Sequence, residues 1–213
     1  MKNEIKNSNY HPEWQNNRIK FIISKYGENF FKGKNILELA PFNGYIGEYF
    51  RNLGANVLSV EGRQSNIDHI KRDYPNLNVI LGNLDTPEWT YGKFDIIINF
   101  GLLYHLEKYH AEHLINCVKN CELMFLESVI FNSFENEILK VPRVGFDQSL
   151  TEIDGYPSQK FVEDIFDGLD IKQYKMYADS SLNGGMHIYD WELNGNKIFH
   201  QSIRRFWIVK NAQ

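Results

Sequence analysis

The stretch NILELAPFNGYIGEYF, residues 35–50, begins as an apolar run and ends as an amphipathic segment. Residues 35–40 have the composition of a buried strand. An amphipathic helix follows, predicted by apolar residues at the spacing i, i+3, i+4, i+7: Ile46, Tyr49, Phe50 and Leu53. Small and turn-forming residues lie between the two segments, so the stretch predicts a strand, a tight bend and a helix.

The same alternation of short apolar runs and helical segments continues along the chain. Parallel sheets covered by helices on both faces have this pattern. The predicted strands are residues 35–40, 55–60, 77–82, 94–99, 122–127, 170–177 and 203–210. We therefore expect an α/β protein with a Rossmann-like, seven-stranded, mostly parallel sheet and helices on both faces.

Capping residues indicate where the predicted helices begin and end. Gly54 can end the first helix, and Ser65 or Asn66 is the expected N-cap of the second, which runs to Pro75. Two more are predicted at residues 111–120 and 158–168, the latter capped by Ser158 and ended by Gly168. Residues 178–202 contain no clean helix, so we expect the final strand to run antiparallel to its neighbour.

The length, charge and ends of the chain limit its class. We expect one domain over residues 1–213, with residues 1–34 forming a helical cap that can lie over a ligand cleft. The formal charge of −4 and the lack of a basic run argue against nucleic acid as a partner. No apolar run has the length of a signal core or a membrane span, so we expect a soluble, cytoplasmic protein without membrane contact.

Cysteine spacing gives no sign of a disulfide framework. Cys117 and Cys121 are four residues apart, which predicts that both lie on one face of a helix as reduced thiols.

Glu38 and the bend after it suggest a ligand site, because ligands of open parallel sheets bind at the carboxyl ends of the strands. Ala40 and Gly44 permit close approach of a ligand to the backbone. Glu38 would repel phosphate and favours a cationic or amine-bearing ligand, although it can instead cap the adjoining helix or pair with a surface lysine. Phe42 either packs against the ligand or belongs to the core.

Later strands end in residues suited to a nucleoside. Glu61 follows the bend by about 20 residues, where a carboxylate typically binds both hydroxyls of a ribose, although it can also be an exposed acid at a strand end. Asn83 and Asp85 follow the third strand, where they can read the exocyclic amine of a base. Gly101 follows the fourth strand and permits close backbone approach.

Taken in order, these motifs resemble those of class I S-adenosylmethionine-dependent methyltransferases. ELAPFNG matches the first motif at Glu38 and Gly44, with Ala40 and Phe42 where glycine is usual. Glu61, Asn83 and the segment FDIIINFGLLYHLE match the later motifs, with Asn83 where aspartate is common. The resemblance implies S-adenosylmethionine as cofactor, S-adenosylhomocysteine (SAH) as product, and a cofactor site made of Glu38, Ala40, Pro41, Phe42, Gly44, Glu61, Gly62, Asn83, Leu84 and Phe100.

Tyr104 and His105 follow the fourth strand, where the resemblance places the methyl acceptor. A neutral imidazole there can take a proton from a hydroxyl or an amine, so we expect these two to be the catalytic residues. The alternative is that His105 caps a helix or bonds within the core. His110 and His113, with Glu107 and Glu112, are expected on the solvated face of a helix at residues 108–120 and not at a metal site.

Two long connections, residues 141–158 and 180–195, are candidate substrate elements. The second contains His187, Tyr189, Asp190 and Trp191 and is either a lid over the acceptor or a surface hairpin whose aromatic residues cover the core. We expect methyl transfer to a hydroxyl or amine of a small molecule, such as a sugar or another metabolite, and a protein side chain or a tRNA base is the acceptor left open beside it. The alternative is a non-catalytic protein of the same fold that binds the cofactor or a related nucleoside as a regulatory or partner protein.

Overall fold

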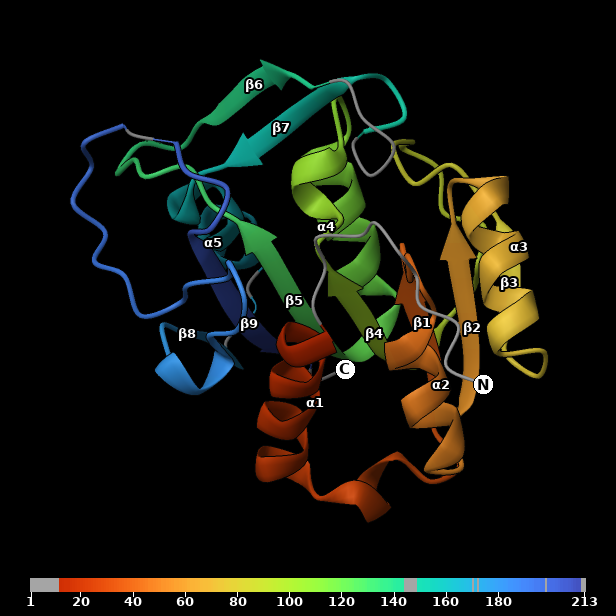
Figure 1. Ribbon diagram of the computed structural model, residues 1–213. Helices are drawn as coiled ribbons and strands as arrows, with labels where there is room; N and C mark the ends of the chain where they lie inside the picture. The colour runs from red at the N-terminus through yellow and green to blue at the C-terminus, as the bar shows by residue number, and fades with distance from the viewer. Residues whose placement is uncertain (1–11, 144–148, 170, 172, 198, 212–213) are drawn as a thin grey trace.

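A seven-stranded sheet forms the centre of the molecule (Figure 1). The computed structural model describes residues 12–143, 149–169, 171, 173–197 and 199–211. The strand order is β3-β2-β1-β4-β5-β9-β8, with β9 antiparallel to both of its neighbours and the other pairs parallel. The strands are β1 Asn35–Leu39, β2 Asn56–Glu61, β3 Asn78–Leu81, β4 Phe94–Phe100, β5 Cys121–Val129, β8 Gln173–Tyr177 and β9 Arg204–Lys210. The predicted sheet and its antiparallel final strand are confirmed.

Helices cover both faces of the sheet because neighbouring residues of each strand face opposite ways. Ile36 and Ile96 join the core beneath α1, α2 and α3, whereas Leu37 and Ile97 join the core beneath α4 and α5. The helices are α1 Pro12–Tyr26, α2 Tyr45–Asn52, α3 Gln64–Asp73, α4 His110–Lys119 and α5 Gln159–Gly168. Their positions leave the carboxyl ends of β1, β2 and β4 open to a ligand.

The helix boundaries follow the predicted caps with one exception. Ser158 caps α5 by accepting a hydrogen bond from the Phe161 backbone N–H at 3.0 Å. The N-cap of α3 is Arg63, not Ser65 or Asn66. Asn66 is buried and its side chain bonds Glu61, so it serves the site and not the helix end.

A two-stranded hairpin that the sequence analysis did not predict lies above the carboxyl edge of the sheet (Figure 1). It consists of β6, Ile138–Pro142, and β7, Ile153–Pro157. Each strand has five residues, and β7 contains Gly155 and Pro157, which are uncommon in strands. The connection expected as a loop at residues 141–158 is therefore partly this hairpin.

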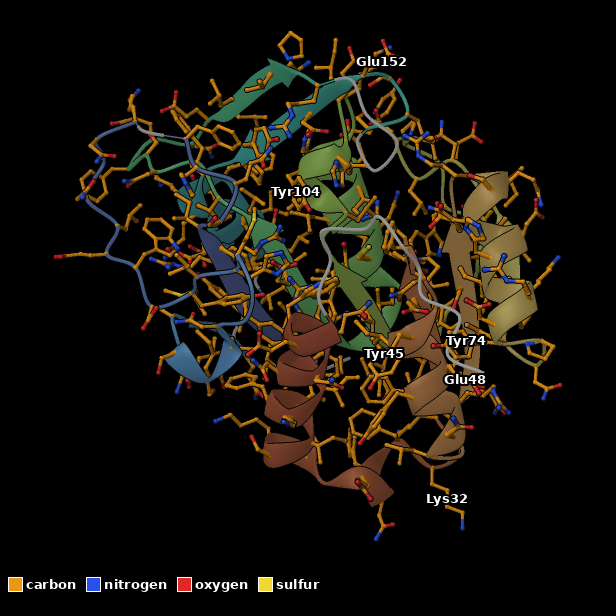
Figure 2. The ribbon with its side chains drawn as sticks, in the orientation of Figure 1. Lys32, Tyr45, Glu48, Tyr74, Tyr104 and Glu152 are labelled. Atoms are coloured by element: carbon orange, nitrogen blue, oxygen red, sulfur yellow. The ribbon has the colours of Figure 1, made fainter. Side chains whose placement is uncertain are left out.

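The amino-terminal segment packs on the sheet through α1 and a 3₁₀ helix, η1 Glu28–Phe31. The Tyr45 hydroxyl, at the start of α2, donates to the Asn16 side chain of α1 at 2.6 Å, and Figure 2 shows Tyr45 between these helices. The described helices include none with the length and apolar character to cross a membrane. Residues 1–11 of the expected cap lie outside the described part of the chain.

The two cysteines do not share a helix face. Cys117 lies in α4, whereas Cys121 is the first residue of β5, because the helix ends at Lys119. Both are buried free thiols. The spacing alone could not show that a strand begins between them.

Candidate active site

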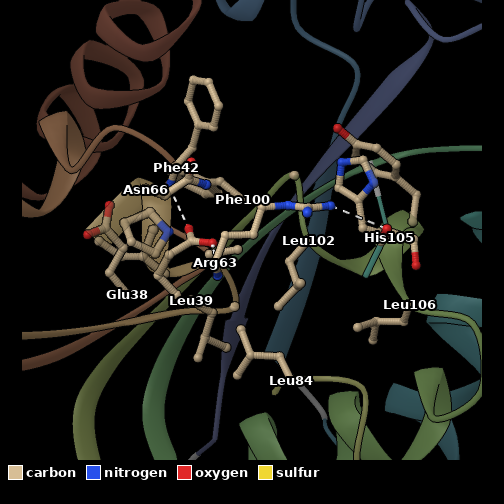
Figure 3. A pocket seen from close by; sticks show the side chains of 18 of the residues that line it. Glu38, Leu39, Phe42, Arg63, Asn66, Leu84, Phe100, Leu102, His105 and Leu106 are labelled. Atoms are coloured by element: carbon tan, nitrogen blue, oxygen red, sulfur yellow. Dashed lines mark hydrogen bonds between the residues drawn. The ribbon is translucent and has the colours of Figure 1, made fainter. Parts of the chain in front are cut away.

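A pocket opens at the carboxyl edge of the sheet. Glu38 and Phe42 lie toward one side of it, His105 and Leu106 lie toward the other, and Leu84 and Leu102 lie between them (Figure 3). The sequence-predicted site residues that line the pocket are Glu38, Ala40, Pro41, Phe42, Glu61, Gly62, Asn83, Leu84, Phe100, Tyr104 and His105. The fold therefore brings the strand-end residues together around one cavity.

Gly44 is the predicted site residue that the pocket lining does not include. It is the N-cap of α2 with a φ of 74°, and a Cβ there would lie 2.9 Å from the Ile70 side chain. Close packing of the turn against α3 accounts for this glycine.

The turn after β1 holds two non-glycine residues in left-handed backbone. Ala40 has a φ of 51° and Phe42 a φ of 57°. L-residues other than Gly, Asn and Asp seldom adopt this conformation, and it costs roughly 1–2 kcal/mol per residue. Strain of this kind collects at functional sites, where the surrounding structure maintains it.

Glu38 is a buried carboxyl group that organises the start of α2. It accepts hydrogen bonds from the Gly47 backbone N–H at 3.0 Å and from the Ser59 hydroxyl at 2.7 Å. Burial raises the pKa of Glu38 to about 7, and these two hydrogen bonds oppose the rise. A Cβ at position 47 would collide with this carboxyl group, so the close contact requires Gly47. Glu38 therefore hydrogen-bonds the first turn of α2, as the helix-capping alternative stated, and Glu38 also lines the pocket.

Glu61 ends β2 with its carboxylate held by backbone donors. It accepts from the Phe42 N–H at 3.2 Å and from the Arg63 N–H at 2.9 Å (Figure 3). Burial raises its pKa, and these hydrogen bonds to the charged form oppose that effect. The Asn66 side chain and the Gly62 backbone N–H also hydrogen-bond this carboxylate, so it is held in one orientation at the pocket wall.

Asn83 and Asp85 differ in which of their hydrogen-bonding atoms are already used by the protein. The Asp85 carboxylate accepts from the backbone N–H groups of Glu107, Lys108 and Tyr109 at 3.0, 3.1 and 2.9 Å. It therefore stabilises the segment that leads into α4. The Asn83 side-chain oxygen accepts from the Asp85 N–H at 3.0 Å, and no described residue accepts from its amide nitrogen. That amide is a donor available at the pocket wall.

His105 is oriented by the β6–β7 hairpin. Its Nδ1 lies 3.0 Å from Asp154 Oδ1, and the Tyr156 hydroxyl donates to Asp154 Oδ2 at 2.9 Å. Asp154 is fully buried and also accepts from the Ser149 N–H at 3.2 Å. Because a carboxylate only accepts hydrogen bonds, the neutral His105 carries its proton on Nδ1 and leaves Nε2 as the basic nitrogen.

Tyr104, unlike His105, is a buried side chain with a weakly acidic hydroxyl. It lies in the interior (Figure 2), its hydroxyl accepts from Arg204 at 3.3 Å, and burial raises its pKa. A neutral, buried phenol of this kind suits packing and orientation better than proton removal.

His110 and His113 do not lie on a solvated helix face, so that expectation is wrong. Both are buried, because α4 turns this side toward the core. His110 Nε2 lies 2.9 Å from the Gly155 carbonyl, and His113 Nε2 lies 2.9 Å from the Asn99 amide. Burial lowers the pKa of His113 to about 4, so this imidazole is neutral at pH 7. Within the described residues no group of histidine, cysteine and acidic side chains has a metal-binding arrangement.

Sequence reasoning missed several polar residues around the His105 end of the pocket. Arg18 of α1 and Arg204 of β9 line the pocket and share Glu127 of β5, while Asp154 holds His105. Their signal was weak, because single charged residues in apolar segments become informative only once their partners are known. Arg18 is a charged residue among the apolar residues of α1, and this departure from the apolar pattern is visible in the sequence.

Comparison with known proteins identifies the fold. No family model and no curated protein matches the sequence. The N-terminal domain of EvdMO1, crystallised in the presence of SAH and D-fucose, is 15% identical, with a TM-score of 0.69 over 97% of this chain and 85% of that one. An S-adenosylmethionine-dependent methyltransferase from Clostridium acetobutylicum is 13% identical, with a TM-score of 0.61 over 93% and 92% of the two chains.

A third structure, an S-adenosylmethionine-dependent methyltransferase from Mesorhizobium loti, is 9% identical, with a TM-score of 0.58 over 85% of this chain and 92% of that one. These likenesses extend over most of each chain. The chain therefore has the fold of class I S-adenosylmethionine-dependent methyltransferases, as the sequence motifs predicted.

Proposed function

We propose that this protein transfers the methyl group of S-adenosylmethionine to a hydroxyl or amine of a small molecule. The observation that carries the proposal is one pocket with the fixed Glu61 carboxylate at the end of β2 and the oriented His105 beyond β4. The first suits a ribose and the second suits a proton acceptor. A structural neighbour crystallised with SAH and D-fucose is in keeping with such a pair of ligands.

The residues present fit the cofactor at several points. Glu61 presents a fixed carboxylate at the pocket wall for the ribose hydroxyls, and the Asn83 amide nitrogen, which has no acceptor among the described residues, is a donor for the base. The strained turn at Ala40 and Phe42 lines the pocket, and the small side chain of Ala40 lets a ligand approach the backbone there. When bound, S-adenosylmethionine supplies an electrophilic methyl group, and Leu84 offers apolar surface to the adenine.

His105 is the proposed proton acceptor. Asp154 fixes its tautomer and ring orientation, so Nε2 is the nitrogen that removes the proton of an acceptor hydroxyl or ammonium. The rest of the catalytic contribution comes from positioning the acceptor in a cavity with apolar walls, since orientation alone can account for much of a displacement reaction.

A methyl-transfer screen tests the proposal. The protein is incubated with S-adenosylmethionine and a panel of sugars, sugar acids and small amines, and SAH and methylated product are measured by mass spectrometry. We expect SAH to form with at least one acceptor at a rate well above the acceptor-free control. Tight binding of SAH without turnover of any acceptor in the panel would favour the second candidate.

That second candidate is a non-catalytic protein that binds the cofactor or a nucleoside. The observation in its favour is the replacement of two usual glycines of the first motif by Ala40 and Phe42. Both residues have positive φ, so the glycine-type turn is present despite the replacements, and it serves either candidate because both bind a ligand there. The oriented His105 favours the enzyme, because binding of a cofactor alone does not require a proton acceptor.

A further inference from the structure

Two arginines share a single carboxylate beside the pocket, and we call Arg18, Glu127 and Arg204 the arginine cluster. Arg18 Nη2 lies 2.9 Å and Arg204 Nη1 lies 2.8 Å from the same oxygen, Glu127 Oε1. All three side chains are at least nine-tenths buried. Both arginines also line the pocket.

The arginine cluster has an excess of positive charge. Its other polar neighbours are neutral: burial raises the pKa of Tyr189, and burial together with the two guanidinium groups lowers the pKa of His187. Among the described residues, Glu127 is the one carboxylate that pairs with either guanidinium. A buried net charge is costly unless a counter-charge reaches it.

Unused hydrogen-bonding atoms point to the same conclusion. Arg18 Nη1 and Arg204 Nε are buried donors with no partner among the described residues, and Glu127 Oε2 is a buried acceptor with none. A Cβ on the pocket-lining Gly101 would lie 3.9 Å from Glu127 Oε2. Such groups are rarely left unsatisfied in native proteins, so a ligand is the natural source of their partners.

The cluster lies near the proposed catalytic residues. Arg204 Nη2 donates to the Tyr104 hydroxyl at 3.3 Å, and the Tyr104 and His105 rings are 4.1 Å apart between centroids. The guanidinium of Arg18 lies 5.4 Å from the centre of the Phe100 ring, at the end of β4. A ligand group that reaches the cluster therefore lies at the His105 end of the pocket, close to Tyr104.

We infer that the arginine cluster binds a carboxylate of a ligand in the pocket, with Arg18 as the principal donor. The inference rests on the proposed function for the identity of the pocket. A guanidinium matches a carboxylate in shape and charge, and the spare acceptor of Glu127 suits an N–H or O–H group beside that carboxylate. Two ligands have this chemistry: the amino-acid end of the cofactor and an acceptor that is a hydroxy or amino acid.

Calorimetric titrations of three proteins test the inference: the wild type, Arg18→Met, and Lys20→Met as the matched control on the exposed side of α1. The probes are SAH, decarboxylated SAH and 5′-methylthioadenosine, which lacks the amino-acid end. If the cofactor supplies the carboxylate, the wild type prefers SAH over decarboxylated SAH at least tenfold, and Arg18→Met removes that preference while Lys20→Met keeps it.

The second arm examines the acceptor. With SAH present, D-glucuronate and D-glycerate are compared with the uncharged D-glucose and glycerol by their effect on melting temperature. If the acceptor supplies the carboxylate, the acids stabilise the wild type, the uncharged compounds do not, and Arg18→Met loses the difference. Arg18→Lys serves where Arg18→Met fails to fold, because it keeps the charge and loses the two-pronged geometry.

The inference is overturned if the wild type binds SAH and its decarboxylated form equally and also responds equally to acids and uncharged compounds. That result is distinct from failure of the proposed function. In the latter case, neither SAH nor 5′-methylthioadenosine would bind, because the nucleoside part of the site is tested by the probe that lacks a carboxylate.

Discussion

The two ends of the pocket are built in different ways. At one end, Glu38 and Glu61 are held by backbone N–H groups of the turns that surround them. At the other end, His105 depends on a residue 49 positions away, and the Glu127–Arg204 pair joins residues 77 positions apart. The first end is formed by local structure at strand ends, whereas the second is formed by long-range pairing.

The electrostatic character of the ends differs as well. The strand-end side is acidic, with carboxyl groups that accept hydrogen bonds, and the other side is basic through Arg18 and Arg204. We therefore expect substitution of Glu61 to change cofactor affinity and substitution of His105 to change turnover, whereas substitution of Arg18 changes cofactor affinity if the cofactor supplies the carboxylate at the arginine cluster.

His105→Ala should lower kcat by roughly 10²–10⁴-fold, the loss typical when a general base is removed. The Kd for SAH should stay within about twofold, because His105 lies on the opposite side of the pocket from Phe42, whose backbone N–H bonds the proposed ribose ligand Glu61 (Figure 3). Steady-state kinetics with an acceptor from the screen and calorimetry with SAH measure the two quantities. His69→Ala, on the exposed side of α3, is the matched control.

An unchanged kcat in folded His105→Ala would remove the catalytic assignment. A loss of SAH affinity equal to the loss of turnover would break the division between the two ends. Tyr104 and the two long connections would then be the next parts of the molecule to test.

Glu38→Gln should change how stability depends on pH. Burial raises the pKa of Glu38 from 4.5 to about 7, so the folded wild type retains a proton that the unfolded chain releases. The free energy of unfolding should therefore fall by about 3 kcal/mol as pH rises from 4.5 to 7. Glutamine has no proton to release, so the variant should lack this part of the slope.

Urea unfolding of both proteins at pH 4.5, 6 and 8 measures the slope. The exposed Glu122→Gln on β5 is the control and should keep the wild-type slope. Parallel stability curves for Glu38→Gln and the wild type would contradict the raised pKa.

Ala40→Gly should stabilise the protein by up to about 1 kcal/mol. Relief of the left-handed backbone gains roughly 1–2 kcal/mol, and the greater freedom of glycine in the unfolded chain offsets part of it. Thermal unfolding should show an increase of about 2–4 °C per kcal/mol for a chain of this size. Ala111→Gly in α4 is a control of opposite sign, because glycine in a helix costs about 1 kcal/mol. Equal losses in both variants would mean that the turn carries no strain.

The difference between the ends also explains what could be predicted from the sequence. The seven sheet strands and the residues at their tips were predictable, because buried parallel strands are continuous apolar runs and the fold brings their ends together. Glu61 and His105 were predicted in this way, and both line the pocket. Arg18, Glu127 and Asp154 were not, because their role appears only when distant segments pair.

The errors have the same physical origin. His110 and His113 were expected in solvent because histidine is polar, but the carbonyl of Gly155 and the amide of Asn99 satisfy them in the interior. The β6–β7 hairpin was missed because its five-residue strands carry too little apolar pattern to stand out. Hydrogen-bond partners across the fold decide such cases, and a single sequence does not contain them.

The central claim is that the carboxyl end of β2 binds the ribose of S-adenosylmethionine, and the affinity for SAH tests it most directly. Calorimetric titration should give one-to-one binding to the wild type. Glu61→Ala should weaken binding by about 1.5–3 kcal/mol, which is about 10–100-fold in Kd, because hydrogen bonds to a charged group are lost. Glu122→Ala should bind as the wild type does. No binding of SAH to the wild type, or an unchanged Kd in a correctly folded Glu61→Ala protein, would contradict the account.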